Sequence, residues 1–347
     1  MRALKYLLPV SLYFLAYLSF TQTGWVVWIT LMYSWILIPV IELFFKPDDK
    51  NLSKASEELI AKDVTYDYLL YFFVIAQYVF LFLFLNSFYK STLSNWDIAG
   101  RIATMGVLCG TFGINLGHEL GHRKNKFEQL LAKSALMTSL YMHFFIEHNK
   151  GHHKHVATPK DPSSARLNEP VYAFYFRSIP LAYLSAWKIA MSDMKKAGHF
   201  ALSWRNEMIH VHISQILFVF CIGYFWGLKT CLFFFLAAVI GVLLLETVNY
   251  VEHYGLQRKE TTQGNFERAM PHHSWNSNHL IGRLMLFELS RHSDHHYLAS
   301  KKYQVLKHHD DAPQLATGYP GSIMLALIPP IWFYIMNKKI MLLNKTA

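Results

Sequence analysis

Long apolar runs separated by short polar segments are the main pattern of this sequence. Six runs come close to the roughly 20 apolar residues that a helix needs to cross the hydrocarbon core of a bilayer. They cover residues 5–21, 25–45, 68–88, 98–116, 209–228 and 231–251. The pattern predicts an all-α integral membrane protein with about six transmembrane helices. We expect the whole chain, residues 1–347, to form a single membrane-embedded domain.

Two shorter apolar stretches do not fit a complete span. Residues 130–145 are interrupted by Lys133, and residues 322–336 contain Pro329 and Pro330. We expect the first stretch to form a helix that carries His148 into a site. The second is interpreted as an interfacial or buried segment.

The distribution of lysine and arginine predicts how the spans are oriented. Basic residues concentrate in the loop 46–62 and in the region that follows residue 117, and such residues favour the cytoplasmic side of a membrane. The N-terminus, residues 117–205 and everything after residue 252 are therefore expected on the cytoplasmic face. The same bias explains the formal net charge of +10, so nucleic-acid binding is not expected.

The cysteines exclude several kinds of site. Cys109, Cys221 and Cys231 lie in or beside apolar runs, and none of them forms a Cys-x-x-Cys pair. A disulfide framework, an iron–sulfur cluster and a rubredoxin-type site are therefore unsupported. Any electrons that this protein uses must come from a separate partner.

Histidines gather in four clusters along the chain. They read His118-Glu-Leu-Gly-His122, His148-Asn-Lys-Gly-His152-His153, a single His253, and His292-Ser-Asp-His295-His296. On a helix, a spacing of four residues points two imidazoles toward the same place. Eight or nine convergent imidazoles can hold two metal ions. Because each cluster lies at or beyond the cytoplasmic end of a span, we expect a cytoplasmic helical cap that holds a histidine-rich di-metal site.

Each multi-histidine cluster also has another interpretation when it is taken alone. The first matches His-Glu-x-x-His of zinc peptidases, in which Glu119 would be the general base. The second could be a solvated basic loop, and His155 is left out as a ligand because the chain turns directly after it. The third could be an exposed polar helix start, although Asp294 could instead hold the ring N–H of a ligand from behind.

His253 differs from the others because it stands alone at the end of a predicted span. A lone histidine in that position is more often an interfacial residue than a ligand. Polar groups at membrane depth are nevertheless costly and usually functional, and several of them precede His253. The residues expected to support ligands from behind are Glu119, Asn249, Glu252 and Asp294. His272, His273 and His279 are interpreted as packing or lid residues.

The three histidine boxes and three further strings carry a family resemblance. The further strings are residues 249–256 (NYVEHYGL), 271–279 (PHHSWNSNH) and 156–162 (VATPKDP). With them the chain resembles the integral-membrane alkane 1-monooxygenases, within the superfamily of histidine-rich membrane fatty acid desaturases and hydroxylases. The similarity runs from about residue 25 to residue 335.

The resemblance implies an activity, its cofactors and its partners. The implied reaction is the terminal hydroxylation of medium- to long-chain n-alkanes to 1-alkanols, with O2 as co-substrate. It implies two non-haem iron ions and six transmembrane helices in a bacterial inner membrane. It also implies rubredoxin as electron donor, itself reduced by an NAD(P)H-dependent reductase. The implied ligands are His118, His122, His148, His152, His153, His253, His292, His295 and His296.

Other functions remain open at this stage. A related membrane hydroxylase or desaturase could act on fatty acyl, aromatic-methyl or terpenoid substrates. An intramembrane zinc protease would leave three clusters unexplained, and a metal transporter would place its histidines inside the spans. We also expect rubredoxin to dock on the cytoplasmic basic residues Arg123, Lys124, Lys126, Lys150, Lys154, Arg258 and Lys259. Aromatic side chains that could line a substrate path are Trp25, Trp28, Trp35, Tyr71 and Phe72.

Overall fold

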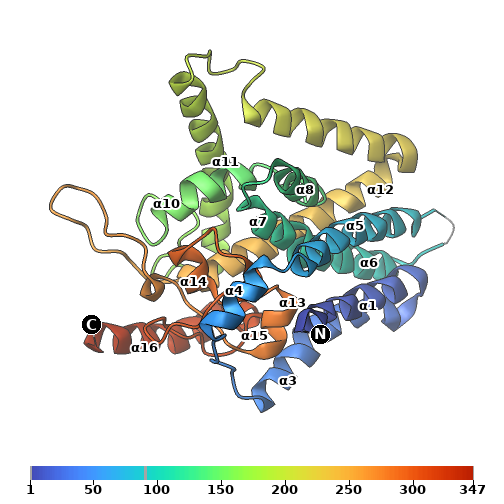
Figure 1. Ribbon diagram of the computed structural model, residues 1–347. Coiled ribbons are helices and arrows are strands. Elements are labelled where there is room, and N and C mark those ends of the chain that lie inside the picture. Colours follow the sequence, from blue (N-terminus) through green and yellow to red (C-terminus); the bar gives the residue numbers. More distant parts are fainter. Residues whose placement is uncertain (1, 90–91, 347) are drawn as a thin grey trace.

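The computed structural model describes residues 2–89 and 92–346 and is built of helices joined by turns and loops (Figure 1). In chain order these are η1 (Arg2–Leu7), α1 (Val10–Thr21), η2 (Gly24–Trp28), α2 (Ile29–Met32), η3 (Tyr33–Leu37), α3 (Ile38–Phe44), α4 (Lys54–Lys62), α5 (Thr65–Asn86), α6 (Asn95–Leu108), η4 (Cys109–Ile114), α7 (Asn115–Gly121), α8 (Lys126–Met137), α9 (Phe144–Glu147), η5 (His148–His152), α10 (His153–His155), α11 (Val171–Lys196), α12 (Glu207–His253), η6 (Pro271–His273), α13 (Leu280–Met285), α14 (His292–Tyr297), η7 (Tyr303–Val305), α15 (Tyr319–Ala326) and α16 (Pro329–Thr346). The described residues form two isolated bridges but no β-strand, which confirms the predicted all-α class for this part of the chain.

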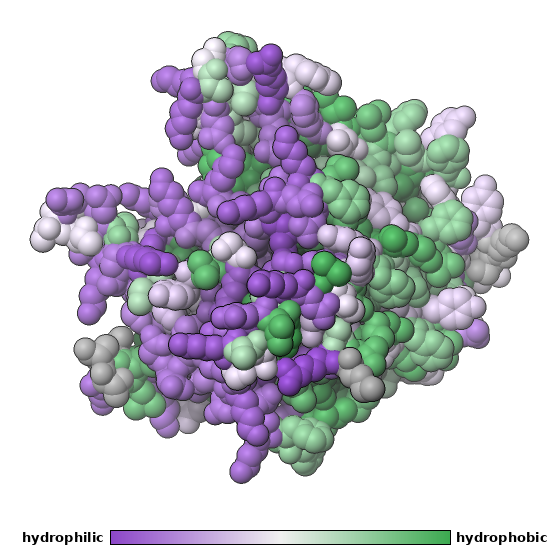
Figure 2. All heavy atoms as spheres, in the orientation of Figure 1, coloured by the Kyte–Doolittle hydropathy of each residue, from purple (hydrophilic) through white to green (hydrophobic). Residues whose placement is uncertain are grey.

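One side of the molecule is apolar and the other is polar. Figure 2 shows hydrophobic residues over the side of α1, α5, α6 and α12, and hydrophilic residues over the side of α4, α10 and α14. Among the described residues, four helices are long and apolar enough to cross a membrane: Arg2–Thr21, Gly24–Phe44, Thr65–Asn86 and Glu207–His253. The pair α15 and α16, bent by 119°, adds a fifth if it counts as one span. The chain is therefore a multi-pass membrane protein.

The long helix α12 covers the last two predicted spans. Among its 47 residues, Gly227 alone is non-helical, with φ 81° and ψ 160°. Glycine adopts a positive φ without the steric cost that a side chain would bring. Across this break, the ring of Phe218 lies 5.7 Å from the ring of Phe234. The two parts of α12 therefore fold back along each other, as Figure 1 shows, and the two predicted spans form a hairpin.

The helix formed by α6, η4 and α7 runs through the centre of the apolar side. It contains the predicted span 98–116, but it is not among the helices apolar enough to qualify as a span by composition. Its glycines allow neighbours to approach closely: a Cβ on Gly106 would collide with Ile240, and one on Gly110 with Leu244. Because most of this helix is buried against protein, it needs fewer apolar side chains than a helix that faces lipid.

The stretch 130–145 is not the single helix that the sequence predicted. Helix α8 ends at Met137, and a turn follows in which Leu140 has a φ of 51°. That backbone conformation ends a right-handed helix. His148 is therefore the first residue of η5, which continues the short helix α9 that begins only after the turn. The prediction was wrong because the apolar composition of the stretch hid this turn.

The segment that follows α12 folds back over the ends of the apolar helices. Within it, Arg283 Nε donates a hydrogen bond of 2.6 Å to Glu288, and Arg291 Nη1 donates one of 2.8 Å to the carbonyl of Leu306. The hydroxyl of Tyr6, from the start of the chain, donates to Glu288 over 2.7 Å. These buried bonds fix α13 and α14 against the N-terminal helices, and α14 carries the third histidine cluster.

Candidate metal centre

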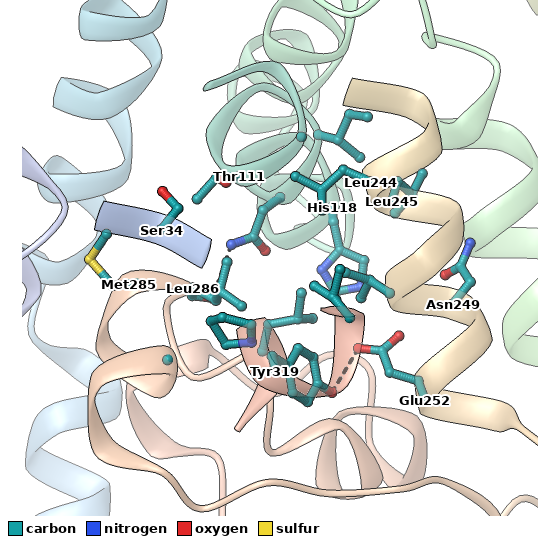
Figure 3. Close-up of a pocket in the computed structure, with 18 of the residues that line it drawn as sticks. Ser34, Thr111, His118, Leu244, Leu245, Asn249, Glu252, Met285, Leu286 and Tyr319 are labelled. Atoms are coloured by element: carbon teal, nitrogen blue, oxygen red, sulfur yellow. Dashed lines mark hydrogen bonds between the residues drawn. The ribbon is translucent and has the colours of Figure 1, made fainter. Parts of the chain in front are cut away.

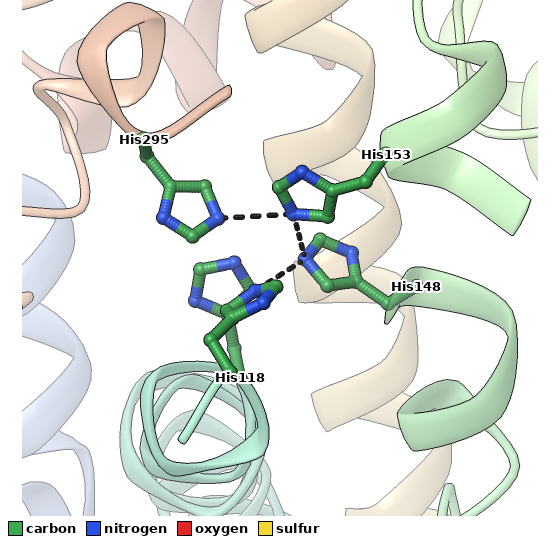
Figure 4. Close-up of side chains that lie close together, drawn as sticks. His118, His148, His153 and His295 are labelled. Atoms are coloured by element: carbon green, nitrogen blue, oxygen red, sulfur yellow. Dashed lines mark hydrogen bonds between the residues drawn. The ribbon is translucent and has the colours of Figure 1, made fainter. Parts of the chain in front are cut away.

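All nine histidines that were implied as ligands come together, in two groups. Group one consists of His118, His122, His148, His153 and His295, and group two of His152, His253, His292 and His296. Within each group, one ring nitrogen from every histidine lies within 4.8 Å of those of the others. Figure 4 shows rings of group one converging from separate helices. The predicted convergence of the four clusters is therefore confirmed.

Group one is assembled by α7, by η5 with α10, and by α14. Nε2 of His148 lies 3.2 Å from Nε2 of His122 and 3.0 Å from Nε2 of His153. Nε2 of His295 lies 3.2 Å from Nε2 of His153. Two nitrogens that bind one ion at about 2.1 Å, at a right angle to each other, are about 3 Å apart. These spacings therefore fit several ligands around one ion.

Group two lies beside group one and is wholly buried. Nε2 of His152 lies 3.3 Å from Nε2 of His296, and Nε2 of His292 lies 3.2 Å from Nε2 of His253. His253 is the last residue of α12, so this long helix contributes a ligand candidate from its polar end. The arrangement fits a second ion.

The second histidine cluster is divided between the two groups. Residues 148–152 form a π-helical turn, which has more residues per turn than an α-helix. His148 and His153, five residues apart, therefore project into group one together, and His152 points into group two. The sequence interpretation that a spacing of four brings His148 and His152 to the same place is wrong for this pair.

Asp161 supports group two and was missed by the sequence reasoning. Its Oδ2 lies 2.9 Å from Nδ1 of His152, with both side chains buried. Ser164 Oγ donates to the same oxygen over 2.6 Å, and the Ser163 amide donates to Oδ1 over 3.1 Å. Asp161 belongs to the string 156–162 that carried part of the family resemblance. Its position in a proline-flanked turn directly after a histidine cluster was the available signal.

Burial keeps most of these imidazoles neutral. It lowers the pKa of His122 to about 3 and the pKa values of His153 and His295 well below their ordinary value. Burial also acts to lower the pKa of His152, but the carboxylate of Asp161 and its hydrogen bond outweigh that effect, so the pKa is raised. Neutral imidazole is the form that binds metal ions.

Two of the four predicted supporting residues contact other parts of the chain. Asp294 accepts a hydrogen bond from His309 Nε2 over 2.7 Å and one from Lys301 Nζ over 2.6 Å. It therefore anchors the segment after α14, and the prediction that it holds a ligand ring is wrong. Glu119 accepts from Arg123 over 2.6 Å, so its carboxylate is paired with a guanidinium instead of being free as a general base.

The other two, Asn249 and Glu252, line a cavity beside the histidines (Figure 3). Oε1 of Glu252 accepts a hydrogen bond from the hydroxyl of Tyr319 over 2.8 Å. Oε2 of Glu252 lies 3.2 Å from Nε2 of His292, at the edge of group two. Glu252 therefore supports group two directly, and its oxygen is close enough to act as a ligand itself.

This central cavity is narrow, with a volume of about 80 Å³. His118 and His148 of group one and His292 of group two form its polar end. Its apolar walls come from Leu12, Ile38, Ile114, Leu244, Leu245, Val248, Met285, Leu286, Leu289 and Ile323. Of the five aromatic residues expected along a substrate path, Trp35 alone is among the lining residues. The space suits a slender apolar molecule with one end at the histidines.

The string 271–279 packs behind His253, as the sequence interpretation expected. Ser274 Oγ lies 3.5 Å from Nδ1 of His253, and Trp275 Nε1 donates to the carbonyl of Tyr254 over 2.9 Å. His272 and His273 lie outside both groups, near Glu267. This segment therefore supports the end of α12.

The donor set fits metal ions. Among the described residues, both ring nitrogens of His118 and Nδ1 of His292 and His296 are buried without a hydrogen-bond partner. A buried polar atom left unpaired costs about 1–3 kcal/mol. A metal ion would satisfy one ring nitrogen of His118, whose neighbours are other imidazoles. Donor sets rich in imidazole suit iron, copper and zinc.

Comparison with known proteins identifies the family. A family model described as fatty acid desaturase matches residues 94–321, which include all nine histidines. The chain is 37% identical to alkane 1-monooxygenase 2 of Pseudomonas aeruginosa over 316 residues, which cover 90% of this chain and 84% of that protein. The chain belongs to the alkane 1-monooxygenase family. The predicted resemblance is confirmed, and this family member is an oxidoreductase of the monooxygenase class.

Two further relatives show how wide the similarity is. The alkane 1-monooxygenase of Pseudomonas putida is 36% identical over 321 residues, which cover 92% of this chain and 80% of that protein. The hydroxylase component of a xylene/toluene monooxygenase of Pseudomonas putida is 25% identical over 242 residues, 70% of this chain and 64% of that protein. This alkane 1-monooxygenase family member therefore shares more with the alkane enzymes than with the aromatic one.

Proposed function

We propose that this protein hydroxylates medium- to long-chain n-alkanes at the terminal carbon, giving 1-alkanols, at a non-haem di-iron centre. One observation carries the proposal: two groups of histidines meet at the polar end of a narrow apolar cavity. The relatives named for alkane 1-monooxygenase activity support the substrate class. O2 is the co-substrate, and the electrons come from rubredoxin and its NAD(P)H-dependent reductase.

In this proposal, group one holds one iron and group two holds the other, so all nine histidines are ligands. Iron suits imidazole donors and changes its oxidation state, which zinc does not. The two irons, when bound, supply the activation of O2 that an unactivated C–H bond requires. Glu252 and Asp161 support group two, and Asn249 lies at the cavity wall nearby.

The chain itself positions the substrate and excludes water. An alkane offers no polar group to bind, so only the shape of the cavity can direct its terminal carbon. Leu244, Leu286 and Ile323 line the cavity together with His118 and His292, and we propose that the alkane lies there with its terminal carbon toward these histidines. Transfer of the alkane from water to these apolar walls is favourable because of the hydrophobic effect.

We further propose six membrane crossings in a bacterial inner membrane, with the histidines on the cytoplasmic side. The crossings are Arg2–Thr21, Gly24–Phe44, Thr65–Asn86, the central helix of α6 to α7, and the two parts of α12. The polar side, which holds the histidine groups and many of the lysines, then faces the cytoplasm and forms one domain with the spans.

Rubredoxin is proposed to dock on exposed lysines of this polar side. The exposed members of the predicted basic surface are Lys124, Lys126, Lys150, Lys154 and Lys259. Arg123 does not belong to it, because its side chain is buried and paired with Glu119. Rubredoxins are typically acidic, so charge attraction would speed their association. Reversing these lysines to glutamate should slow rubredoxin-dependent turnover, most strongly at low salt. Unchanged turnover would place docking elsewhere.

The experiment that tests the proposed function combines metal analysis with turnover. Protein from iron-57-enriched cells is expected to hold two irons in nitrogen-rich sites by Mössbauer spectroscopy. With rubredoxin, its reductase and NAD(P)H, it should convert an n-alkane to the 1-alkanol, which gas chromatography identifies. Bound zinc without iron, or no alcohol from any alkane, would overturn the proposal.

The related alternatives are separated by the same assay. The aromatic relative motivates xylene as a competing substrate, and the superfamily motivates a fatty acyl substrate. We expect the alkane to be preferred, because the central cavity is narrow and lined with aliphatic side chains. Faster oxidation of xylene methyl groups, or a desaturated product, would assign the chain to the alternative.

A further inference from the structure

A second cavity lies between α11 and the second part of α12. Its volume is about 490 Å³, within the roughly 300–1,000 Å³ range of small-molecule sites and larger than the central cavity. Its apolar walls include Ile179 and Pro180 from α11, and Val239, Val242 and Leu243 from α12. Of the lining residues, Pro180, Phe235 and Val239 are exposed on the surface. An aliphatic chain from the bilayer would therefore meet an apolar opening.

The inner end of this second cavity is polar. His143, Tyr141, Tyr183 and Gln215 contribute to its lining. Nε2 of His143 has no hydrogen-bond partner among the described residues, and the residue is only 7% exposed. A buried polar atom without a partner costs about 1–3 kcal/mol unless a ligand or a water satisfies it. A bound ligand that offers a hydrogen-bonding group to His143 would therefore be favoured.

Contacts of the backbone and of neighbouring rings fix the position of His143 beside the cavity. The turn after α8 includes Leu140, whose φ of 51° is unusual for a residue with a side chain. The amide of Met142 donates to Gln215 Oε1 over 2.9 Å, which ties the turn to α12. The ring of His143 lies between the rings of Tyr141 and Tyr183, at 4.3 Å and 5.3 Å. The side chain is thus fixed, and His143 is one of the residues that line the cavity.

The lack of basic side chains in the lining indicates which polar group an aliphatic ligand can carry. None of the described residues that line the second cavity is a lysine or an arginine. A carboxylate or phosphate head would lose its hydration there without gaining a cation, which is unfavourable. An alkane would leave His143 unpaired. A hydroxyl both donates and accepts, so it satisfies a neutral histidine in either tautomer. A neutral alcohol on a single aliphatic chain fits both the walls and the inner end.

The two cavities lie on opposite faces of the same structural wall. Phe144 lines the central cavity and Tyr141 lines the second one, and their rings stack 6.2 Å apart. On α12, Leu244 faces the central cavity and Leu243 the second. An alcohol formed at the histidine groups would thus arise one side-chain layer away from the second cavity.

We propose that the second cavity binds a primary aliphatic alcohol, with the hydroxyl at the imidazole of His143 and the chain directed toward the bilayer. The identity of the natural ligand as reaction product rests on the proposed function. The binding itself does not, because it involves none of the clustered histidines and needs no turnover.

The test is photolabelling of the full chain in lipid nanodiscs. The probe is 1-dodecanol with a diazirine in its chain, applied to resting protein without reductant. Peptide mapping should place the label on residues 179–183 and 235–243. Excess 1-dodecanol should remove this label, and excess dodecane should not. Label on Leu244 and Val248 instead, or label that dodecane displaces equally, would overturn the proposal.

Variants of His143 sharpen the result. His143→Phe keeps the shape but loses the hydrogen bond, and labelling in the second cavity should fall about tenfold. His143→Gln retains a hydrogen-bonding group and should keep most of the labelling. His210→Phe, at an exposed histidine of α12 that does not line the cavity, serves as the matched control and should label like the wild type. Labelling that is equal in all three variants would show only partitioning into lipid.

The outcomes also separate this inference from the proposed function. If alkane turnover fails while His143-dependent labelling persists, the alcohol site stands and the reaction assignment falls. If turnover succeeds while labelling does not depend on His143, the alcohol site falls alone. His143→Phe that does not fold leaves the competition between dodecanol and dodecane on the wild-type protein to decide.

Discussion

The two histidine groups offer the same kind of side chain but differ in what surrounds them. Group one has five histidines and no carboxylate among its described hydrogen bonds. Group two has four, and two carboxylates touch it: Asp161 at His152 and Glu252 at His292. Carboxylates behind a ligand fix its ring and strengthen it as a donor. Group two therefore has carboxyl groups beside two of its histidines, where group one has a fifth imidazole.

Because of this difference, we expect metal binding in the two groups to depend to unequal degrees on single residues. Group one can lose one ring and keep four, whereas each histidine of group two is a larger share of its donor set. Group two also depends on the loop 156–162 and on the bond between Glu252 and Tyr319. We expect substitutions around group two to remove one iron selectively, and the following experiments measure that asymmetry.

The largest effect is expected from removing one ligand of group two. His253→Ala should release about one iron per chain and lower alkane turnover by more than the roughly 100-fold that loss of an outer partner costs. His122→Ala, in group one, should retain more of its iron. Iron content and Mössbauer spectra of both variants measure the difference. Equal loss in the two variants would refute the asymmetry.

The next effect concerns the carboxylate behind His152. Asp161→Asn keeps the size but removes the charge, so iron affinity at group two should fall by about 10–100-fold. Asp294→Asn is the matched control, because its carboxylate contacts Lys301 and His309 instead of a ligand candidate. Chelator titration followed by iron analysis compares the two. A stronger effect from Asp294→Asn would contradict the assignment of supporting residues.

A smaller effect is expected at the cavity edge. Glu252→Gln should lower the iron affinity of group two by roughly tenfold, since an amide oxygen is a weaker donor to a metal ion than a carboxylate oxygen. Tyr319→Phe removes only the hydrogen bond to Glu252 and should retain more iron. Mössbauer spectra should show one of the two iron sites changed in Glu252→Gln. An unchanged spectrum would mean that Glu252 acts only on packing.

The smallest effect is expected at Ser274. Its hydroxyl lies 3.5 Å from Nδ1 of His253, at the limit of a hydrogen bond, so Ser274→Ala should lower iron affinity only about twofold. The same chelator titration measures it against Asp161→Asn. A loss as large as that of Asp161→Asn would show that the string 271–279 holds His253 more tightly than this distance indicates.

Several features of the fold could be predicted from particular residues. The apolar runs located the helices of the membrane side, and Gly227 separated the last two of them into a hairpin. The turn at Leu140 was not predictable, because its strained backbone is held by contacts such as that between Met142 and Gln215, 73 positions apart. The central helix also looked like an ordinary span, because its burial depends on neighbours that fold around its glycines.

The sequence by itself indicated most residues of the candidate metal centre. Eight imidazoles at short spacings next to apolar helices predicted it, the family resemblance added the lone His253, and the structure brings these nine together. Only the tertiary structure decided how they divide. Because residues 148–152 form a π-helical turn, His153 lies with His148 in group one and His152 lies in group two. Sequence spacing cannot distinguish that turn from an α-helix. Asp161 and the second cavity likewise exist only where distant segments pack together, because a buried contact depends on position in space and not along the chain.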